Sequence, residues 1–554
     1  MFKGHPKGLY VAFFTNMGER FGFYTMMACL VFYLQARYDL AEDTAGEIYS
    51  WYYFFIYALA LVGGYIADRT QNFKGTIFAG IITMLAGYIL MSLPGLSLTF
   101  TISALFVIAF GNGLFKGNLQ ALVGQLYDDP KYSKFRDSAF NIFYMGINIG
   151  AFFAPSAANG IRNWYLRTQG FAYNSDLAKL ANSFIHNHLS NPAQLDQLNQ
   201  LATQMNGGVA VADLHAYTQN YMHAFSTGYN FAFAIAGISM IISMLVFIFF
   251  KQRLPERRQS DKASRDAIRL PWSEERPRLI ALGLVFIVVI FFWMSFHQNG
   301  LTLSYFARDY TLNHVGPVTK LFFTLKSLLS VIAVIFGIVF LVQRKTQPMM
   351  RLLGAVLVIG GGVLTYVFYQ GYASGPNNPI EPEIFQQWNP IFIVFLTPLV
   401  VGFFAWLHKH GKEPSTPRKI GIGMILAALA FTVMLSGSFG LTSPHDLAGA
   451  PSPYRISPYW LVNTYLVLTV AELFLSPMGL SFVSKVAPPR FQGLMQGGWL
   501  FATAIGNKLL FVGSKMWVKI ELWQLWLIFI VVCLISAAFI FSIMKRLDRI
   551  TQSV

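Results

Sequence analysis

Apolar stretches long enough to cross a membrane recur along almost the whole of this 554-residue chain. A helix that crosses a hydrocarbon core of about 30 Å needs roughly 20 mostly apolar residues. Fourteen such windows follow one another: 10–36, 48–67, 76–95, 99–126, 138–158, 226–250, 278–306, 318–343, 349–372, 388–408, 419–437, 458–484, 492–513 and 522–544. Because lipid cannot satisfy backbone hydrogen bonds, each window is expected to form a helix. The sequence therefore predicts an all-α integral membrane protein.

The composition supports this class and argues against others. Hydrophobic residues make up 55% of the chain and charged residues only 12%, whereas soluble domains contain about 25% charged residues. A net charge of +16 would suggest nucleic-acid binding in a soluble protein, but here the basic residues lie mostly in short connections between windows. We therefore expect no nucleic-acid partner. Cys29 and Cys533 both lie in apolar windows, where we interpret them as packing residues.

The distribution of basic residues predicts the orientation of the chain. If the N-terminus is cytoplasmic, the connections on that side hold 28 Lys and Arg residues, and those on the other side hold nine. Cytoplasmic loops of membrane proteins carry an excess of these residues. We therefore expect both termini to face the cytoplasm.

Two longer segments interrupt the short connections. Residues 159–225 are expected on the outer side, and apolar positions at helical spacing from Leu177 to Met205 predict a small periplasmic helical cap. Residues 251–277 are rich in charged side chains and predict a cytoplasmic linker. This linker separates an N-terminal six-helix bundle, residues 1–250, from a C-terminal bundle, residues 278–554.

Very few charged residues lie deep inside the apolar windows. Glu19 and Arg20 stand side by side in the first window, and Glu472 is the other carboxylate deep in a window. A charge at mid-depth costs roughly 2.5–3.5 kcal/mol on insertion scales, so it is kept mainly where it lines a cavity or handles a charged solute. These residues predict a transporter.

Several motifs occur in an order that indicates a family. The first window contains N-M-G-E-R-F-G-F-Y at 16–24, and two further motifs are G-G-Y-I-A-D-R at 63–69 and F-Y-M-G-I-N-I-G at 143–150. Later motifs are F-W at 292–293 with Gln298, Asn389-Pro390, E-P-S-T-P at 413–417 and A-E-L-F-L-S-P at 471–477. This ordered set resembles the motifs of proton-dependent oligopeptide transporters, a family of the major facilitator superfamily.

The resemblance implies a fold and a function. The fold is that of two six-helix bundles, with an extra helix pair at 318–372 that we expect at the periphery. The function is secondary active import of di- and tripeptides by proton symport through alternating access, so the protein is not expected to be an enzyme. We expect a monomer in the bacterial inner membrane, with peptide, protons and the lipid bilayer as partners and with no cofactor or metal.

The chemistry of a peptide indicates which residues bind it. A short peptide is a zwitterion, so a pocket that accepts many peptides should hold both charged ends and tolerate the middle. Arg20 and Lys116 provide cations for the C-terminal carboxylate, and Glu472 provides an anion for the N-terminal ammonium. By the family pattern, Asn148 and Asn389 help to hold the ammonium.

Further residues are expected to wall the pocket and to couple transport to protons. Tyr24, Tyr57 and Trp499 offer amphipathic rings that stack or hydrogen-bond. The candidates for proton coupling are Glu19, Glu472 and His297.

Structural roles are alternatives for several of these residues. Glu19 and Arg20 can pair to tie the first helix to a neighbour, and Lys116 can snorkel to the membrane interface. The two asparagines can serve as interhelical hydrogen-bonding residues, and Tyr57 and the tryptophan as packing residues. Lys508 has no family role, and we expect it to pair with an acidic neighbour or to cap a helix.

The chain departs from the family pattern at three positions. Asn16 replaces the first acid of the first-helix motif, so only Glu19 remains of that pair. Met27 stands where the family usually has an arginine and His297 where it has an acid, so both ends of a usual salt bridge are missing. Another small zwitterionic or anionic cargo, or sodium-linked or facilitated uptake, is therefore an alternative. His297 becomes a candidate titrating residue of the gate.

Overall fold

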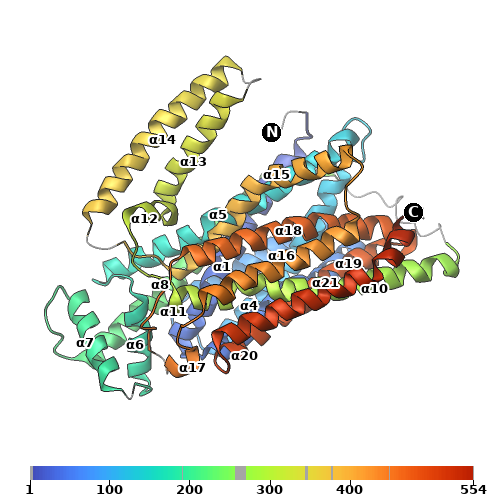
Figure 1. The fold of residues 1–554 in the computed structure, drawn as a ribbon. Helices are drawn as coiled ribbons and strands as arrows, with labels where there is room; N and C mark the ends of the chain where they lie inside the picture. Colours follow the sequence, from blue (N-terminus) through green and yellow to red (C-terminus); the bar gives the residue numbers. More distant parts are fainter. Residues whose placement is uncertain are drawn as a thin grey trace.

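The computed structural model describes residues 4–189, 191–255, 270–343, 347–375, 378–447 and 450–552, and the regular elements in these ranges are helices (Figure 1). Two isolated β-bridges, Thr311 to Ile456 and His314 to Pro379, join connections between helices. Ten helical segments are long and apolar enough to cross a membrane. The prediction of an all-helical membrane protein is confirmed.

The long helices pack in two groups. The N-terminal bundle consists of α1 (Gly8–Tyr38), α2 (Glu42–Thr70), α3 (Phe73–Ser92), α4 (Leu98–Gln125), α5 (Arg136–Thr168) and α8 (Leu214–Phe250). The C-terminal bundle consists of α10 (Trp272–Phe296), α15 (Trp388–Lys409), α16 (Thr416–Gly437), α18 (Tyr459–Val486), α19 (Gln492–Lys508) and α21 (Leu522–Gln552). The bundles meet where α2 packs against α19 and where α5 packs against α15.

Short helices complete the connections. They are η1 (Ser133–Phe135), η2 (Lys251–Arg253), η3 (His297–Gly300), α11 (Thr302–Tyr310), α12 (Pro317–Phe323), η4 (Pro382–Gln387), α17 (Pro444–Leu447), η5 (Pro489–Phe491) and α20 (Phe511–Trp517). All fourteen predicted windows coincide with helices, which is consistent with fourteen spans. The windows beyond the ten apolar segments correspond to α1, α5, α18 and α19, which carry many of the predicted site residues.

The segment 159–225 differs from the prediction in its boundaries. Helix α5 continues to Thr168 and α8 already begins at Leu214, so the loop is shorter than expected. Two helices fill it, α6 (Ser175–Ile185) and α7 (Pro192–Met205). The expected helical cap is therefore present. The side chains of Asn174 and Asn191 accept backbone hydrogen bonds at the starts of these helices, as N-caps do.

The cap helices mark one end of the molecule. Helices α6, α7 and α17 lie at that end, which we name the cap end, and both chain termini lie at the other (Figure 1). The predicted linker begins with η2 and ends in the first turns of α10, and its residues 256–269 lie outside the described ranges.

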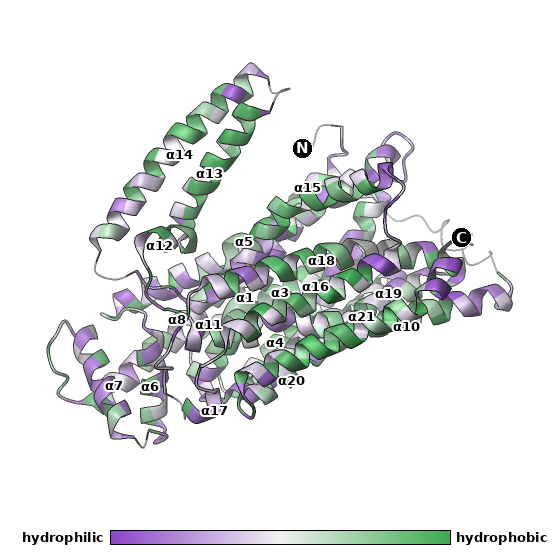
Figure 2. Ribbon diagram, in the orientation of Figure 1, coloured by the Kyte–Doolittle hydropathy of each residue, from purple (hydrophilic) through white to green (hydrophobic). Residues whose placement is uncertain are grey.

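The extra helix pair consists of α13 (Leu325–Val342) and α14 (Pro348–Ser374) and projects away from the two bundles (Figure 1). The helices approach closely because Gly337 and Gly354 face each other: a Cβ on Gly337 would lie 2.7 Å from the carbonyl oxygen of Gly354. Most of α14 is apolar and exposed (Figure 2), as expected of a surface that faces lipid. The pair therefore lies at the periphery of the fold.

Candidate substrate-binding site

The adjacent Glu19 and Arg20 of α1 form a buried ion pair. The Arg20 Nε and Nη2 atoms donate to the two carboxylate oxygens at 2.5 and 2.6 Å, and only 1% of Glu19 and 3% of Arg20 are exposed. The amide of Asn112 in α4 donates to Glu19 at 2.5 Å. The motif therefore ties α1 to α4, as the structural alternative expected. The guanidinium also lies 4.6 Å from the centre of the Phe23 ring.

Lys116 of α4 points at an aromatic ring. Its Nζ lies 3.7 Å from the centre of the Tyr57 ring, which α2 provides. Helix α4 continues for nine residues beyond Lys116, or about 13 Å, before it ends at Gln125. The ammonium is therefore held beside Tyr57, which argues against snorkelling to the interface.

Glu472 of α18 is held by the second bundle. The amide of Asn389, one residue into α15, donates to a Glu472 carboxylate oxygen at 2.9 Å and to the Thr469 hydroxyl at 3.1 Å. Asn389 therefore fixes the direction of the carboxylate. This is the interhelical hydrogen bond that the structural alternative described, and it involves a candidate binding residue.

The aromatic residues connect the two sets of charges. Tyr24 and Tyr57 are half-buried, and both lie within electrostatic range of Arg20 and of Glu472. Tyr24 of α1 and Tyr57 of α2 therefore lie near charges of both bundles.

Asn148 and Trp499, two further candidate residues, contact backbone and apolar groups in this conformation. The amide of Asn148 donates to the carbonyl of Tyr144 in its own helix at 3.1 Å. Trp499 is buried and packs on Gly479 of α18, where a Cβ would collide with its ring, and lies edge-on to Phe286 of α10 at 6.3 Å between ring centres. The contacts of Trp499 are those of a packing residue.

His297 lies between the bundles at the start of η3. Its ring stacks on Trp293 at 4.7 Å between centres, and Tyr53 of α2 covers it at 4.6 Å. Nδ1 lies 2.6 Å from the Oδ1 atom of Asn507 in α19. Met27, the other departure from the family pattern, is buried and apolar. The two positions are thus filled by an apolar side chain and by an imidazole that is hydrogen-bonded to a neutral amide.

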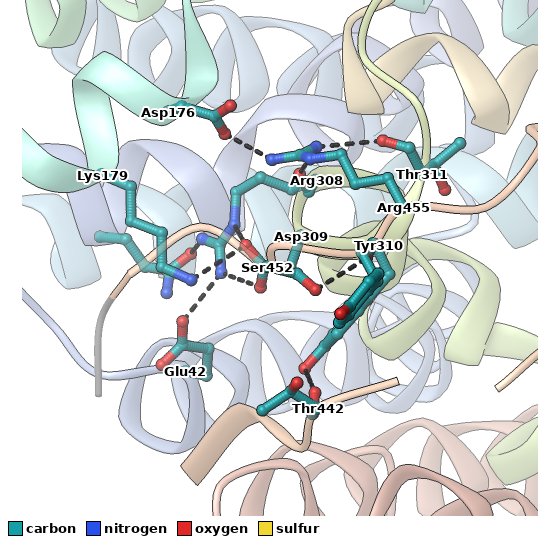
Figure 3. A network of polar contacts seen from close by, with 12 residues as sticks. Glu42, Asp176, Lys179, Arg308, Asp309, Tyr310, Thr311, Thr442, Ser452 and Arg455 are labelled. Carbon is teal, nitrogen blue, oxygen red and sulfur yellow. Dashed lines mark hydrogen bonds and ion pairs between the residues drawn. The ribbon is translucent and has the colours of Figure 1, made fainter. Parts of the chain in front are cut away.

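A network at the cap end was missed in the sequence because its members lie outside the apolar windows or at their ends (Figure 3). Arg308 donates to Gln35 and to Glu42 of the N-terminal bundle, each at 2.8 Å, and its Nε and Nη2 atoms donate to the Asp309 carboxylate. From the cap helix α6, Lys179 binds Asp309 at 3.2 Å and Asp176 binds Arg455 at 2.5 Å. This network joins the two bundles through the cap.

Two other polar groups lie outside the candidate site. Lys508 pairs with Glu47 of α2 at 3.5 Å, which confirms the expectation of an acidic partner. In the E-P-S-T-P motif, hydrogen bonds from Lys419 and His408 lower the pKa of the Glu413 carboxyl below its usual value, against the effect of partial burial.

One group within the described ranges has ligand atoms spaced closely enough to hold a metal ion. His445, Asp446 and Glu521 place these atoms within 4.8 Å of one another. Two of the three residues are exposed, and none belongs to the site around Glu472.

The family is shown by comparison with known proteins. The family model described as "PTR2: POT family" matches residues 74–273 and 373–524, well over half of the chain. The uncharacterized transporter YclF of Bacillus subtilis (strain 168) is 29% identical over 533 residues, which cover 92% of this chain and 87% of the relative. A di-/tripeptide transporter of Lactococcus lactis subsp. cremoris is 28% identical, with 92% of this chain and 89% of the relative covered.

Solved structures show the same fold. A POT family transporter in complex with 5-aminolevulinic acid matches with a TM-score of 0.67 at 20% identity, covering 99% of this chain and 98% of that chain. The peptide transporter POT in complex with sulfate matches with a TM-score of 0.65 at 21% identity, covering 99% and 96%. The resemblance seen in the motifs is therefore confirmed, and the chain belongs to the POT family.

Proposed function

We propose that this protein is a secondary active transporter that imports di- and tripeptides by proton symport through alternating access. The observation that carries the proposal is the placement of opposite charges on the two bundles. Arg20 and Lys116 belong to the N-terminal bundle and Glu472 to the C-terminal bundle. A zwitterionic peptide that reaches both sets of charges contacts both bundles and favours their closure around it.

The relatives support a peptide as the cargo. The Lactococcus relative is named a di-/tripeptide transporter, and a Xenorhabdus bovienii relative, 25% identical over 91% of this chain, is named dipeptide and tripeptide permease B. In this proposal Arg20 and Lys116 bind the peptide carboxylate, and Glu472 binds the ammonium. The supporting residues of the pocket are Tyr24, Tyr57, Asn148, Asn389 and Trp499.

The orientation follows from the basic residues. With both termini in the cytoplasm of a bacterial cell, the cap end faces outward, and its ion pairs close the outer side of the transporter. Glu19, Glu472 and His297 are the proposed proton-coupling residues. The protein works as a monomer, because both sets of peptide-binding charges come from one chain.

Uptake of a labelled dipeptide into proteoliposomes tests the proposal. We expect accumulation only with an inwardly directed proton gradient, and competition by unlabelled di- and tripeptides that is weakened when either peptide end is blocked.

Glu472→Gln and Arg20→Lys should each abolish uptake. The first variant loses the partner of the peptide ammonium, and the second loses the planar guanidinium that binds a carboxylate with two hydrogen bonds. His297→Gln should flatten the dependence on external pH.

The possible results separate the alternatives. Uptake that follows a sodium gradient, or that equilibrates without any gradient, would overturn proton symport. Transport of a small anionic or zwitterionic solute without any competition from peptides would overturn the peptide cargo.

A further inference from the structure

A fully buried ion pair joins the bundles at a place that the sequence did not single out. Arg162 of α5 donates through Nη1 to an oxygen of Glu383 in η4, and both side chains are 0% exposed. Arg162 belongs to the N-terminal bundle and η4 leads into α15 of the C-terminal bundle. The pair therefore spans the contact between α5 and α15 that must separate when the cap end opens.

The two carboxylate oxygens of Glu383 have different surroundings. The Tyr229 hydroxyl of α8 donates to Oε1 at 2.9 Å, the same oxygen that Arg162 binds. Oε2 is buried and makes no hydrogen bond with the described residues. A buried carboxylate oxygen without a partner calls for a proton or a water molecule.

The contact between α5 and η4 beside the ion pair contains polar side chains, and several of their buried atoms have no hydrogen-bond partner in the described part of the chain. One turn before Arg162, both side-chain polar atoms of Asn159 are buried and have no partner in the described part of the chain. One turn after Glu383, the Nε2 atom of Gln387 is likewise unpaired, while its Oε1 accepts from Ser156 at 3.2 Å. Unsatisfied polar groups of this kind in native proteins are usually bridged by ordered water. Such water would give a proton a route to Oε2.

Arg162 also makes contacts that do not depend on the charge of Glu383. Its guanidinium carbon lies 4.2 Å from the centre of the Tyr173 ring and 5.2 Å from that of Tyr229, and Nη1 also contacts the Tyr229 oxygen at 3.1 Å. Aromatic faces stabilise a buried cation. When Glu383 is neutral, the arginine keeps these aromatic contacts and the Tyr229 oxygen, although its buried Nη2 atom has no hydrogen-bond partner in the described part of the chain. Removing the arginine, by contrast, leaves a buried carboxylate without its ion-pair partner.

We propose that Glu383 is a further proton-coupling residue of this transporter, with Arg162 as its partner across the bundles; this rests on the proposed proton symport. The charged carboxylate holds η4 to α5 and keeps the cap end closed. A proton from water on the outer side binds Oε2, the ion pair is lost and the cap end opens. When the cap end closes again, the proton leaves Oε2 for water in the transport cavity, and the ion pair forms anew.

Several elements place titratable groups against the Glu383 carboxylate. The facing groups are Arg162 from α5, Tyr229 from α8, Tyr173 from the connection before α6 and Cys29 from α1. Arginine, tyrosine and cysteine have reference pKa values of about 12 or more, 10 and 8.5. Toward α11, Gln386 donates a hydrogen bond to the Ser304 hydroxyl, and the charged residues of that helix, Arg308 and Asp309, bind each other.

Glu381 lies two residues before Glu383 and is a matched control. It is half-buried, and its carboxylate accepts a hydrogen bond from Asn163 of α5 at 2.8 Å. It thus shares the connection and the partner helix of Glu383, but its hydrogen-bond partner is a neutral amide, while Arg162 and Lys320 lie within its electrostatic range.

The test measures the opening of the cap end directly. Cysteines are introduced at two exposed positions of the cap end, Gln169 after α5 and Lys519 after α20, and each carries a spin label. Pulsed electron paramagnetic resonance then measures the distance between the two labels, and so between the bundles. Cys29 and Cys533 are buried and are not expected to be labelled. In the wild-type protein we expect a short distance at neutral pH and a growing long-distance population as the pH falls. Glu383→Gln should show the long distance at neutral pH as well, and Glu381→Gln should behave as wild type.

Transport assays provide a second readout. Glu383→Gln should retain dipeptide binding and exchange of internal for external peptide, but should lose at least tenfold in gradient-driven accumulation. Tyr229→Phe removes one hydrogen bond to Oε1 and keeps the ring beside Arg162, so it should move the opening transition to higher pH. If Glu383→Gln does not fold, Tyr229→Phe decides.

Clear outcomes would overturn the proposal. The first is a distance between the labels in Glu383→Gln that depends on pH as it does in the wild-type protein. The second is gradient-driven accumulation of peptide that is unchanged in Glu383→Gln. The third is an opening transition that occurs at the same pH in Tyr229→Phe as in the wild-type protein. A different result would separate this proposal from the proposed cargo. If the cap end of the wild-type protein opens at acidic pH and that of Glu383→Gln is open at every pH, but no peptide is taken up, then the role of Glu383 is supported and the peptide cargo is overturned.

Discussion

At the residue scale, Lys116 is a cation held beside an aromatic ring inside the bundle. Its ammonium lies over the Tyr57 ring, which attracts the charge without neutralising it. Arg20 is different, because Glu19 already occupies two of its nitrogens. Lys116 is therefore the cation that has more to gain from the carboxylate of a peptide.

We predict that Lys116→Ala weakens dipeptide binding by about 10- to 100-fold, the equivalent of one charge-assisted hydrogen bond of roughly 1.5–3 kcal/mol. Thermal-shift titration with a dipeptide measures the change. Tyr57→Phe keeps the ring beneath the ammonium and is the control, with an expected change below about threefold. Wild-type affinity in Lys116→Ala would show that the lysine has a structural role only.

At the element scale, close contact between helices depends on small residues at particular positions. A Cβ on Gly63 of α2 would lie 2.0 Å from the carbonyl oxygen of Gly113 in α4, and Asn118 of α4 donates to the Gly63 carbonyl at 3.0 Å. A Cβ on the neighbouring Gly64 would meet none of the described atoms within 4 Å. Two adjacent glycines of one motif thus have different environments.

Gly63→Ala should destabilise the protein by about 1–3 kcal/mol, because the backbones of α2 and α4 must move apart to admit the methyl group. Gly64→Ala should change the stability by no more than about 1 kcal/mol, and in the favourable direction, because alanine is the better helix former. Thermal unfolding in detergent compares the two variants. Equal unfolding temperatures would contradict the close packing of α2 against α4.

At the scale of the whole molecule, the two bundles are held together at the cap end by several charged contacts. Arg308 is central to them, since it binds Glu42 of one bundle and Asp309 of its own (Figure 3). It also donates to Gln35 of the first bundle. Helix α6 adds Lys179 and Asp176 as further contacts to the C-terminal bundle. Alternating access requires that these contacts break and form again in every cycle.

We predict that Arg308→Gln shifts the cap end toward opening, because Glu42 loses its cation and Asp309 keeps only that of Lys179. The labels at positions 169 and 519 report this as a larger long-distance population at neutral pH. Arg136→Gln removes an ion pair with Asp128 whose side chains are 48% and 45% exposed, and it should leave the distances unchanged. Identical distributions in both variants would argue against a role for Arg308 in closure.

The helices and the class of this protein could be predicted from the sequence, and so could the buried charges around which the site is proposed. The bilayer imposes a local rule, an apolar window of fixed length, so each helix is visible in its own stretch of sequence. Glu19, Arg20 and Glu472 were visible for the same reason, since charges are conspicuous among apolar neighbours. Tertiary structure decided which partners these residues have, such as Asn112 for Glu19 and Asn389 for Glu472.

Tertiary structure also decided the burial of charges near the ends of windows. Glu383 lies in a polar connection and looks solvent-exposed in the sequence, but η4 places it against α5 and buries it completely. Arg162 follows a window, and its burial depends on α5 extending past the predicted end. Contacts between distant segments are set by how the two bundles pack, and no local pattern of apolar residues encodes that packing.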